Sequence, residues 1–210
     1  MRILGVLKLS DFVGVCSDID FSSYPFVDLT GRHSVVNNGV LQSSNKALFV
    51  NPTHDTNNHM VLTGSNNDFN LQRDFDVSLK FKINTLKVLQ YIFSVGMLDL
   101  TQSDVSGMIK VAVLSGDMKV YTDFQQSPSP YLSLVSSSTI SAGVEYLYKL
   151  QKRGNVYTVF IDGGVVAVGT NTNFAYKKIK ERVVYLGRQS SNSIVGCFDG
   201  TIDDFKYQTF

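Results

Sequence analysis

Two strand-like runs joined by Asp-Gly near the carboxyl end constrain the fold more than any other feature of the chain. The runs are Val156–Ile161 and 165–168, and Asp162-Gly163-Gly164 separates them. β-Branched and aromatic residues favour strands, and a tight hairpin turn needs positive φ angles, which glycine adopts without strain. The segment therefore predicts an antiparallel β-hairpin, and with it a chain built from antiparallel strands.

Similar short runs recur along the whole chain, whereas helical periodicity is scarce. We expect strands at residues 47–50, 60–62, 75–83, 89–95, 108–114, 119–122, 131–135, 145–152, 156–161, 165–168, 183–186 and 200–207. Turn-forming residues at 115–117 and 153–155 predict two more hairpin tips. Residues 173–182 contain good helix formers and a small basic cluster, and we interpret them as a solvated loop or a single helical turn. Many short strands separated by turns are typical of a sandwich or barrel.

Composition limits the class of protein. The chain has 210 residues, of which 43% are hydrophobic, and a formal net charge of +1. This length suffices for one all-β sandwich with a sizeable core. The near-neutral charge argues against nucleic acid or an anionic membrane as a partner. No apolar run approaches the roughly 18 residues that a membrane-spanning helix requires.

We divide the chain into an N-terminal arm or first strand at residues 1–20 and one domain at residues 21–210. Lys8 and Asp11 interrupt the apolar start, and no clean small-residue cleavage site follows. We therefore expect this start to be retained and not to be a signal peptide. The polar stretch at 127–130 is interpreted as a loop within the domain, because the strands on both sides share one pattern.

The cysteines and histidines offer little chemistry. Cys16 and Cys197 are too few for a disulfide-rich scaffold. The first and last strands of a sandwich are often neighbours, which leaves a bond between the two open, but we favour two buried, inert thiols. His54 and His59 flank Asp55 in a polar loop, yet their spacing matches no closed zinc pattern. We expect that loop to be exposed to solvent.

Four blocks of sequence in a fixed order carry a resemblance to a known family. They are Asp28-Leu29-Thr30-Gly31 with Asn38-Gly39-Val40; Ala47-Leu48-Phe49-Val50, Met60-Val61-Leu62, Asp68-Phe69-Asn70-Leu71 and Asp74-Phe75-Asp76-Val77-Ser78-Leu79; the late hairpin at 156–166; and Leu186-Gly187-Arg188 with Phe198-Asp199-Gly200-Thr201-Ile202-Asp203-Asp204-Phe205-Lys206-Tyr207. Over roughly residues 20 to 210 the chain resembles the laminin-G-like, concanavalin A-like lectin/glucanase jelly roll. The resemblance implies an all-β sandwich of two antiparallel sheets. Family members often place Trp in the central strand, and this chain has none, so we expect Phe and Tyr to fill the core.

The sequence does not favour catalysis. Glycosidases of the retaining type hold two carboxylates about 5–5.5 Å apart. Glu145 and Glu181 are the only glutamates, and neither has an acidic residue two or four positions later. Asp203 and Asp204 are adjacent, so in a regular strand they would point to opposite faces. We therefore expect no enzyme activity, and a degenerate glycosidase is the last of three alternatives.

The resemblance also implies a structural calcium ion, since many family members hold one with loop Asp and Asn. Hard cations take carboxylate and carbonyl oxygens, and Asp28 with Asp203 or Asp204 would supply them if the first and last strands are neighbours. The alternative is that Asp28 is an Asx-turn residue and that the strand carboxylates are exposed. No other cofactor is expected.

A sugar-binding face combines aromatic stacking with polar hydrogen bonds. The tyrosines in or next to strand-like runs are the candidates for glycan contacts: Tyr91, Tyr121, Tyr131 and Tyr157. For each of them the alternative is a place at the edge of the core, with the hydroxyl group in water.

Together these points predict a binding or structural module. The chain looks similar to modules of bacteriophage virions, which predicts a capsid decoration, head or tail fibre or receptor-binding part, with other virion proteins or a host-surface glycan as partner. Residues 1–20 would then dock on another subunit by strand addition. The alternative is a soluble or secreted lectin for cell-surface glycans. The sequence leaves open whether the chain forms a homo-oligomer.

Overall fold

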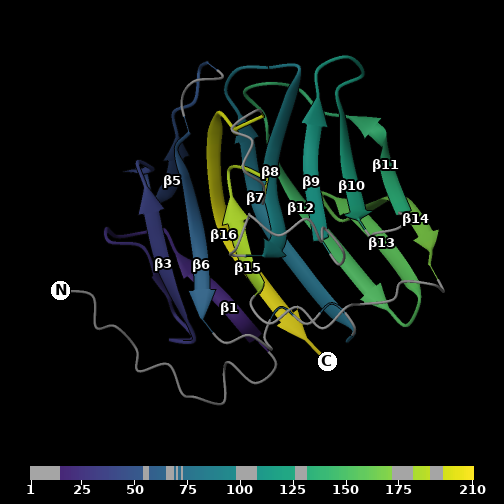
Figure 1. Cartoon of the computed structure of the whole chain (residues 1–210). Coiled ribbons are helices and arrows are strands. Elements are labelled where there is room, and N and C mark those ends of the chain that lie inside the picture. The colour runs from purple at the N-terminus through teal and green to yellow at the C-terminus, as the bar shows by residue number, and fades with distance from the viewer. Residues whose placement is uncertain are drawn as a thin grey trace.

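The computed structural model describes residues 15–53, 57–64, 69, 71, 73–97, 108–125, 132–171, 182–189 and 196–210. Within these residues every regular element is a strand, and the strands form two sheets that pack face to face (Figure 1). The predicted all-β sandwich is therefore confirmed. In the described part of the chain no helix is long and apolar enough to cross a membrane.

The first sheet has nine strands, and all of its pairs are antiparallel. Its main path runs through β14 (Gly164–Thr170), β13 (Val156–Ile161), β12 (Glu145–Arg153), β7 (Phe75–Ile83), β16 (Gly200–Thr209), β1 (Val15–Asp20) and β2 (Val27–Asp28). β5 (Lys46–Phe49) pairs with β16, and β4 (Leu41–Ser43) pairs with β5.

The second sheet has seven strands, again antiparallel. Its order is β11 (Leu132–Thr139), β10 (Lys119–Gln125), β9 (Met108–Leu114), β8 (Leu89–Met97), β15 (Arg182–Leu186), β6 (His59–Gly64) and β3 (His33–Asn38). Strands from distant parts of the sequence thus lie side by side, since β15 is inserted between β8 and β6.

The late hairpin is formed as predicted. β13 and β14 pair antiparallel on either side of Asp162 and Gly163, whose φ angles are 50° and 81°. Two successive residues with positive φ are the signature of the type I′ turn that suits a two-residue hairpin. The tips predicted at 115–117 and 153–155 likewise join paired strands, β9 with β10 and β12 with β13.

Phe and Tyr fill the core, as expected for a chain without Trp. The ring of Phe93 lies edge-on to those of Tyr148 and Phe205, with centroids 5.9 and 6.2 Å apart. Such contacts between buried rings add to the free energy gained from burial alone. The hydroxyl groups of Tyr148 and Thr122 lie 2.9 Å apart inside the core, which satisfies both polar groups.

The first described residues of the chain form a strand, which is one of the two alternatives predicted for residues 1–20. Residues 15–20 form β1, which lies between β16 and β2 in the sheet, so this part is the first strand of the sandwich. Residues 1–14 lie outside the described residues. So do the predicted loop at 127–130 and the basic segment up to residue 181, after which Arg182 begins β15.

Candidate functional site

The outer face of the nine-stranded sheet is covered by ion pairs. β7, β12, β16 and β1 carry acidic and basic side chains on this face, and oppositely charged neighbours across the strands bind each other. The pairs are Lys80–Asp204 at 2.5 Å, Lys149–Asp76 at 2.8 Å, Arg153–Asp76 at 2.9 Å, Lys206–Asp18 at 3.2 Å, and Lys46–Glu145. Because these charges satisfy one another, this face offers few unpaired groups to a ligand.

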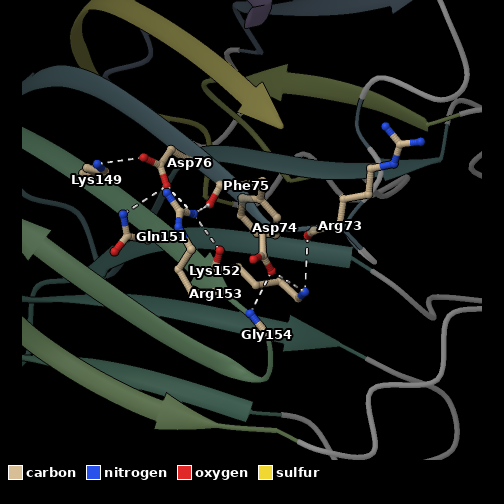
Figure 2. A network of polar contacts seen from close by, with 9 residues as sticks. All are labelled: Arg73, Asp74, Phe75, Asp76, Lys149, Gln151, Lys152, Arg153 and Gly154. Atoms are coloured by element: carbon tan, nitrogen blue, oxygen red, sulfur yellow. Dashed lines mark hydrogen bonds and ion pairs between the residues drawn. The ribbon is translucent and has the colours of Figure 1, made fainter. Parts of the chain in front are cut away.

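Figure 2 shows how dense this pairing is at one end of β7 and β12. Asp76 lies between Lys149, Gln151 and Arg153 and accepts bonds from all three. Burial alone would raise the pKa of Asp76, but these bonds hold the pKa below its usual value. Just before β7, Asp74 accepts a 2.7 Å hydrogen bond from Gly154 N, in the turn between β12 and β13. The network stabilises the pairing of β7 with β12.

The outer face of the seven-stranded sheet has a different character. Tyr121 of β10 lies directly opposite Ala112 of β9, and Ala112 lies directly opposite Tyr91 of β8. Residues opposite each other share a face, so the two half-buried tyrosines flank a small residue at a spacing of two strands, about 9.5 Å. Val135 of β11 continues the row beyond Tyr121. We call Tyr91, Ala112 and Tyr121 the tyrosine row.

Polar groups lie beside the tyrosine row. Asp123 and Lys110 face each other across β10 and β9 in the neighbouring register position. Asp123 accepts a 2.6 Å hydrogen bond from Ser133 Oγ, and Lys110 Nζ lies 6.0 Å from the centre of the Tyr91 ring. Burial lowers the pKa of Lys110, while the Asp123 carboxylate opposes this effect. Aromatic surface with an adjacent cation and acceptor is the chemistry that binds a sugar ring and its polar substituents.

Local irregularities place Tyr91 on this face. A register shift between Tyr91 and Phe93 makes Ile92 an extra residue, so Ile92 and Phe93 are both buried while Tyr91 turns outward. The carbonyl oxygen of Gly196 accepts a 2.7 Å hydrogen bond from Tyr91 N. A Cβ on Gly196 would lie 2.9 Å from Tyr91 Cδ2, so only glycine lets the chain approach the ring this closely.

The other tyrosine of the row is held by its hydroxyl group. Tyr121 Oη donates a short hydrogen bond to the carboxylate of Asp117, at the tip of the β9–β10 hairpin. This bond raises the pKa of Tyr121 and lowers that of Asp117. The ring is therefore oriented before any ligand arrives, which reduces the entropy that binding must overcome.

The remaining candidate tyrosines do not join the row. Tyr157 is buried in the core, with its ring centre 4.5 Å from that of Phe124, and burial raises its pKa to about 12. The prediction that Tyr157 faces a groove is therefore corrected: it lies on the inner face of β13. Tyr131 lies outside the described residues.

Asp28 occupies the Asx-turn position and not an open ion site. Its Oδ1 accepts bonds from Asp18 N at 2.9 Å and Thr30 N at 3.2 Å. Its Oδ2 accepts bonds from Thr30 Oγ1 at 2.6 Å and His33 N at 3.0 Å, and lies 3.0 Å from His33 Nδ1. The buried carboxylate thus joins β1, β2 and β3. The contact with His33 could not be predicted, because no sequence pattern links the two residues.

The prediction that Asp203 and Asp204 point to opposite faces of the sheet is wrong. A bulge between Asp203 and Lys206 adds a residue to β16, and Asp204 has a φ of 51°. Ile202 and Phe205 are buried on either side of the pair, so both carboxylates lie on the outer face. Burial and the charge of Asp204 raise the pKa of Asp203. Among the described residues no three acidic, histidine or cysteine side chains gather as a metal site, so Asp28 does not meet this pair.

The predicted polar loop around His59 is corrected in part. His59 begins β6 and is buried, its Nδ1 lies 2.8 Å from Asn57 O, and burial lowers its pKa. His54 and Asp55 lie outside the described residues. Cys197 is also buried, with Sγ 3.4 Å from Asn57 Oδ1, and burial raises its pKa. Cys197 carries no disulfide bond, which agrees for this residue with the favoured interpretation of buried thiols, and the side chain of Cys16 lies outside the described residues.

Comparisons with known proteins agree on the fold. No protein-family model matches the chain, and no curated protein matches its sequence. The botulinum neurotoxin serotype D binding domain matches with a TM-score of 0.66 at 13% identity, over 93% of this chain and 48% of that chain. The CBM40 of Ruminococcus gnavus IT-sialidase, bound to alpha2,3 sialyllactose, matches with a TM-score of 0.54 at 15% identity, over 66% of this chain and 76% of that chain. Trypanosoma rangeli sialidase in complex with sialic acid matches with a TM-score of 0.68 at 11% identity, over 93% of this chain and 31% of that chain.

The chain thus spans about half of the toxin binding domain and about a third of the sialidase chain. At such low identities the likeness shows the fold alone. The fold is a lectin-like β-sandwich, which confirms the predicted fold class.

Proposed function

We propose that the chain is a glycan-binding module and that the tyrosine row is the centre of its binding face. The observation that carries the proposal is the register that places Tyr91 and Tyr121 on either side of Ala112. Ala112 is itself buried, so a sugar would contact the exposed parts of the two tyrosine rings, and Lys110 and Asp123 lie beside them as partners for its polar substituents. The described tyrosines of the nine-stranded sheet, Tyr146, Tyr148, Tyr157 and Tyr207, all lie on its inner side, in or against the core.

Sialylated glycans are the first ligands to test. Two of the matched structures contain sialic acid or a sugar that carries it: the CBM40 is bound to alpha2,3 sialyllactose, and the Trypanosoma rangeli sialidase, 31% of which is matched, is in complex with sialic acid. Lys110 adds a cation beside the tyrosine row that would attract the sugar carboxylate. Replacement of Lys110 by Met would then weaken binding of sialyllactose more than binding of lactose.

A glycan array followed by titration calorimetry tests the proposal. Tyr121→Ala removes one wall of the row, and we expect roughly tenfold weaker binding, about 1.4 kcal/mol, from the lost stacking. Tyr121→Phe keeps the ring and loses the bond to Asp117, so it should retain most of the affinity. The control is Tyr24→Ala, since Tyr24 is 66% exposed and lies in the loop before β2. Binding to no glycan, or equal losses in Tyr121→Ala and Tyr24→Ala, would refute the proposal.

The module is proposed to bind without catalysis. The two carboxylates beside Tyr121 already serve as acceptors, Asp117 for the Tyr121 hydroxyl and Asp123 for the Ser133 hydroxyl. Glycoside hydrolysis would need two carboxyl groups available to the glycosidic bond, whereas both of these already accept a side-chain hydroxyl group. Release of a fluorescent aglycone from a sialoside or another glycoside by the purified chain would overturn this part of the proposal.

The narrower proposal is that the module works in a bacteriophage virion, as a decoration, fibre or receptor-binding part that contacts other virion proteins or a host-surface glycan. Its support is the resemblance of the sequence blocks to such modules. The alternative is a secreted lectin for cell-surface glycans. Capsid or tail genes beside the coding sequence would support the virion, and their absence together with robust glycan binding would favour the lectin.

A further inference from the structure

One corner of the nine-stranded sheet lacks the ion pairs that cover the rest of its outer face. It consists of three cross-strand pairs between β13 and β14: Val156 with Thr170, Thr158 with Val168, and Phe160 with Val165. None of these six residues, which we call the corner patch, is charged. Val156, Val165 and Val168 are 42%, 57% and 60% exposed, so the patch presents apolar surface to solvent next to a strongly charged face.

The corner patch ends at an open sheet edge. β14 is the last strand of its sheet, and no strand among the described residues pairs with its other side. β11, the last strand of the other sheet, lies against β14, because a Cβ on Gly169 would meet Leu134 Cδ2 at 2.6 Å. Neither strand contains a charged residue, although 18% of the chain is charged. Proteins commonly protect open edges with charges, and the described residues of this side lack that protection.

The opposite side of the sandwich differs. There the nine-stranded sheet ends in β2 and β4, which have two and three residues. Edges this short cannot template a partner strand. β3 ends the other sheet and is longer, but its outward positions are mostly hydroxyl and amide side chains, with Val36 as its exposed apolar residue. The β14 edge is therefore the place where a strand can be added together with apolar surface.

We propose that a second copy of this chain docks on this edge, with the two β14 strands antiparallel about a two-fold axis. In a two-fold contact residue i meets residue j and residue j meets residue i, so a charge close to the axis would lie near its own copy. An uncharged, β-branched patch is compatible with itself in this way. A bulge at Val166 leaves residues 167–170 as the regular part of the strand, and this part supplies the free main-chain groups for the pairing.

The geometry of such a dimer has a consequence for ligand binding, which rests on the proposed function. The two-fold axis between antiparallel strands of one continuous sheet is perpendicular to that sheet, so both copies keep the same face outward. Both seven-stranded sheets then lie on one side, and both tyrosine rows face the same direction. A surface that carries many glycans would be bound by both rows at once, with an avidity well above the single-site affinity.

Size-exclusion chromatography with light scattering over a concentration series tests the dimer directly. We expect a dimer whose population rises with concentration and persists in high salt, because no charges lie across the contact. Val168→Lys should raise the dimer dissociation constant by about tenfold or more, since two lysines would face each other. The matched control is Val36→Lys, on the exposed edge strand β3 at 47% exposure, which should leave the dimer intact.

Three outcomes would overturn the proposal: a wild-type chain that is monomeric at its highest soluble concentration, a dimer that survives Val168→Lys, or equal loss in Val36→Lys. A thermal melt of each variant confirms that the folded state is compared. Failure of the dimer is distinguishable from failure of glycan binding, because titration with a soluble monovalent sugar reports on the tyrosine row alone. Val168→Lys should leave that titration unchanged and lower binding to a glycan-coated surface.

Discussion

Replacement of Asp28 by Asn tests how the first three strands are held together. Burial alone would raise the pKa of this carboxyl, but hydrogen bonds from His33, Asp18 and Thr30 outweigh burial and lower the pKa from 3.8 to about 2. A fall of about 1.8 pH units at about 1.36 kcal/mol each is worth about 2.4 kcal/mol of unfolding free energy. Since the folded pKa is the lower one, this contribution is complete above the unfolded value of 3.8 and is lost as the pH falls through about 2.

Urea unfolding of the wild type and Asp28→Asn between about pH 7 and pH 2 measures this contribution. In Asp28→Asn an NH2 group replaces an oxygen that accepts hydrogen bonds, so the donors of Thr30 and His33 lose their acceptor. We therefore expect Asp28→Asn to lower the free energy of unfolding by about 2–4 kcal/mol at neutral pH. Its stability should then change less than that of the wild type between about pH 4 and pH 2. Asp20→Asn is the control, because Asp20, on the neighbouring strand β1, accepts one local bond, from Ser22 N. Parallel pH profiles for the wild type and Asp28→Asn would refute the reasoning.

Two further predictions follow from backbone geometry and from the acidic residues. Gly163→Ala should cost about 1–2 kcal/mol in a thermal or urea melt, because Gly163 has a φ of 81° while a Cβ there would touch nothing within 4 Å. Gly116→Ala, at another hairpin tip with equally open space but no positive φ, should cost far less, and equal losses would contradict the assignment to φ strain. The carboxylate of Asp28 is saturated by donors of the chain and does not meet Asp203 and Asp204 in one cluster, so addition of a chelator should leave the melting midpoint unchanged; a lower midpoint would restore the calcium ion implied by the family resemblance.

Three of the longer strands could be predicted to the residue from the sequence. β7, β9 and β13 begin and end at the predicted residues, because they are rich in β-branched and aromatic residues and turn residues bound them. The short strands at the start of the chain show the limit of this signal. β2 and β4 are too short to display a period, and β1 buries Ser17 on the inward side. These strands are set by their partners in the sheet and not by their own pattern.

The candidate site could be predicted only in its residue types. Tyr91 and Tyr121 were candidates because they lie in strand-like runs, but the same argument selected Tyr157, which is buried. What separates them is the register across β8, β9 and β10 together with the extra residue Ile92. A single sequence does not report either feature, because a shift of one residue moves every side chain to the other face.

The bulge in β16 can be predicted by comparing the free energy gained from burying apolar side chains with the cost of a left-handed backbone residue. In a strictly alternating strand, burial of Ile202 would force Phe205 and Tyr207 outward. Burial of each of these rings is worth about 1.5–3 kcal/mol, whereas one non-glycine residue in the left-handed region costs about 1–2 kcal/mol, and Asp is among the residues that tolerate it best. Burial therefore exceeds the backbone cost, which is why Asp204 takes a φ of 51° and all three apolar side chains are buried. Apolar residues separated by two acidic positions in a strand-like run, as here, thus predict a bulge and not an acidic pair on opposite faces.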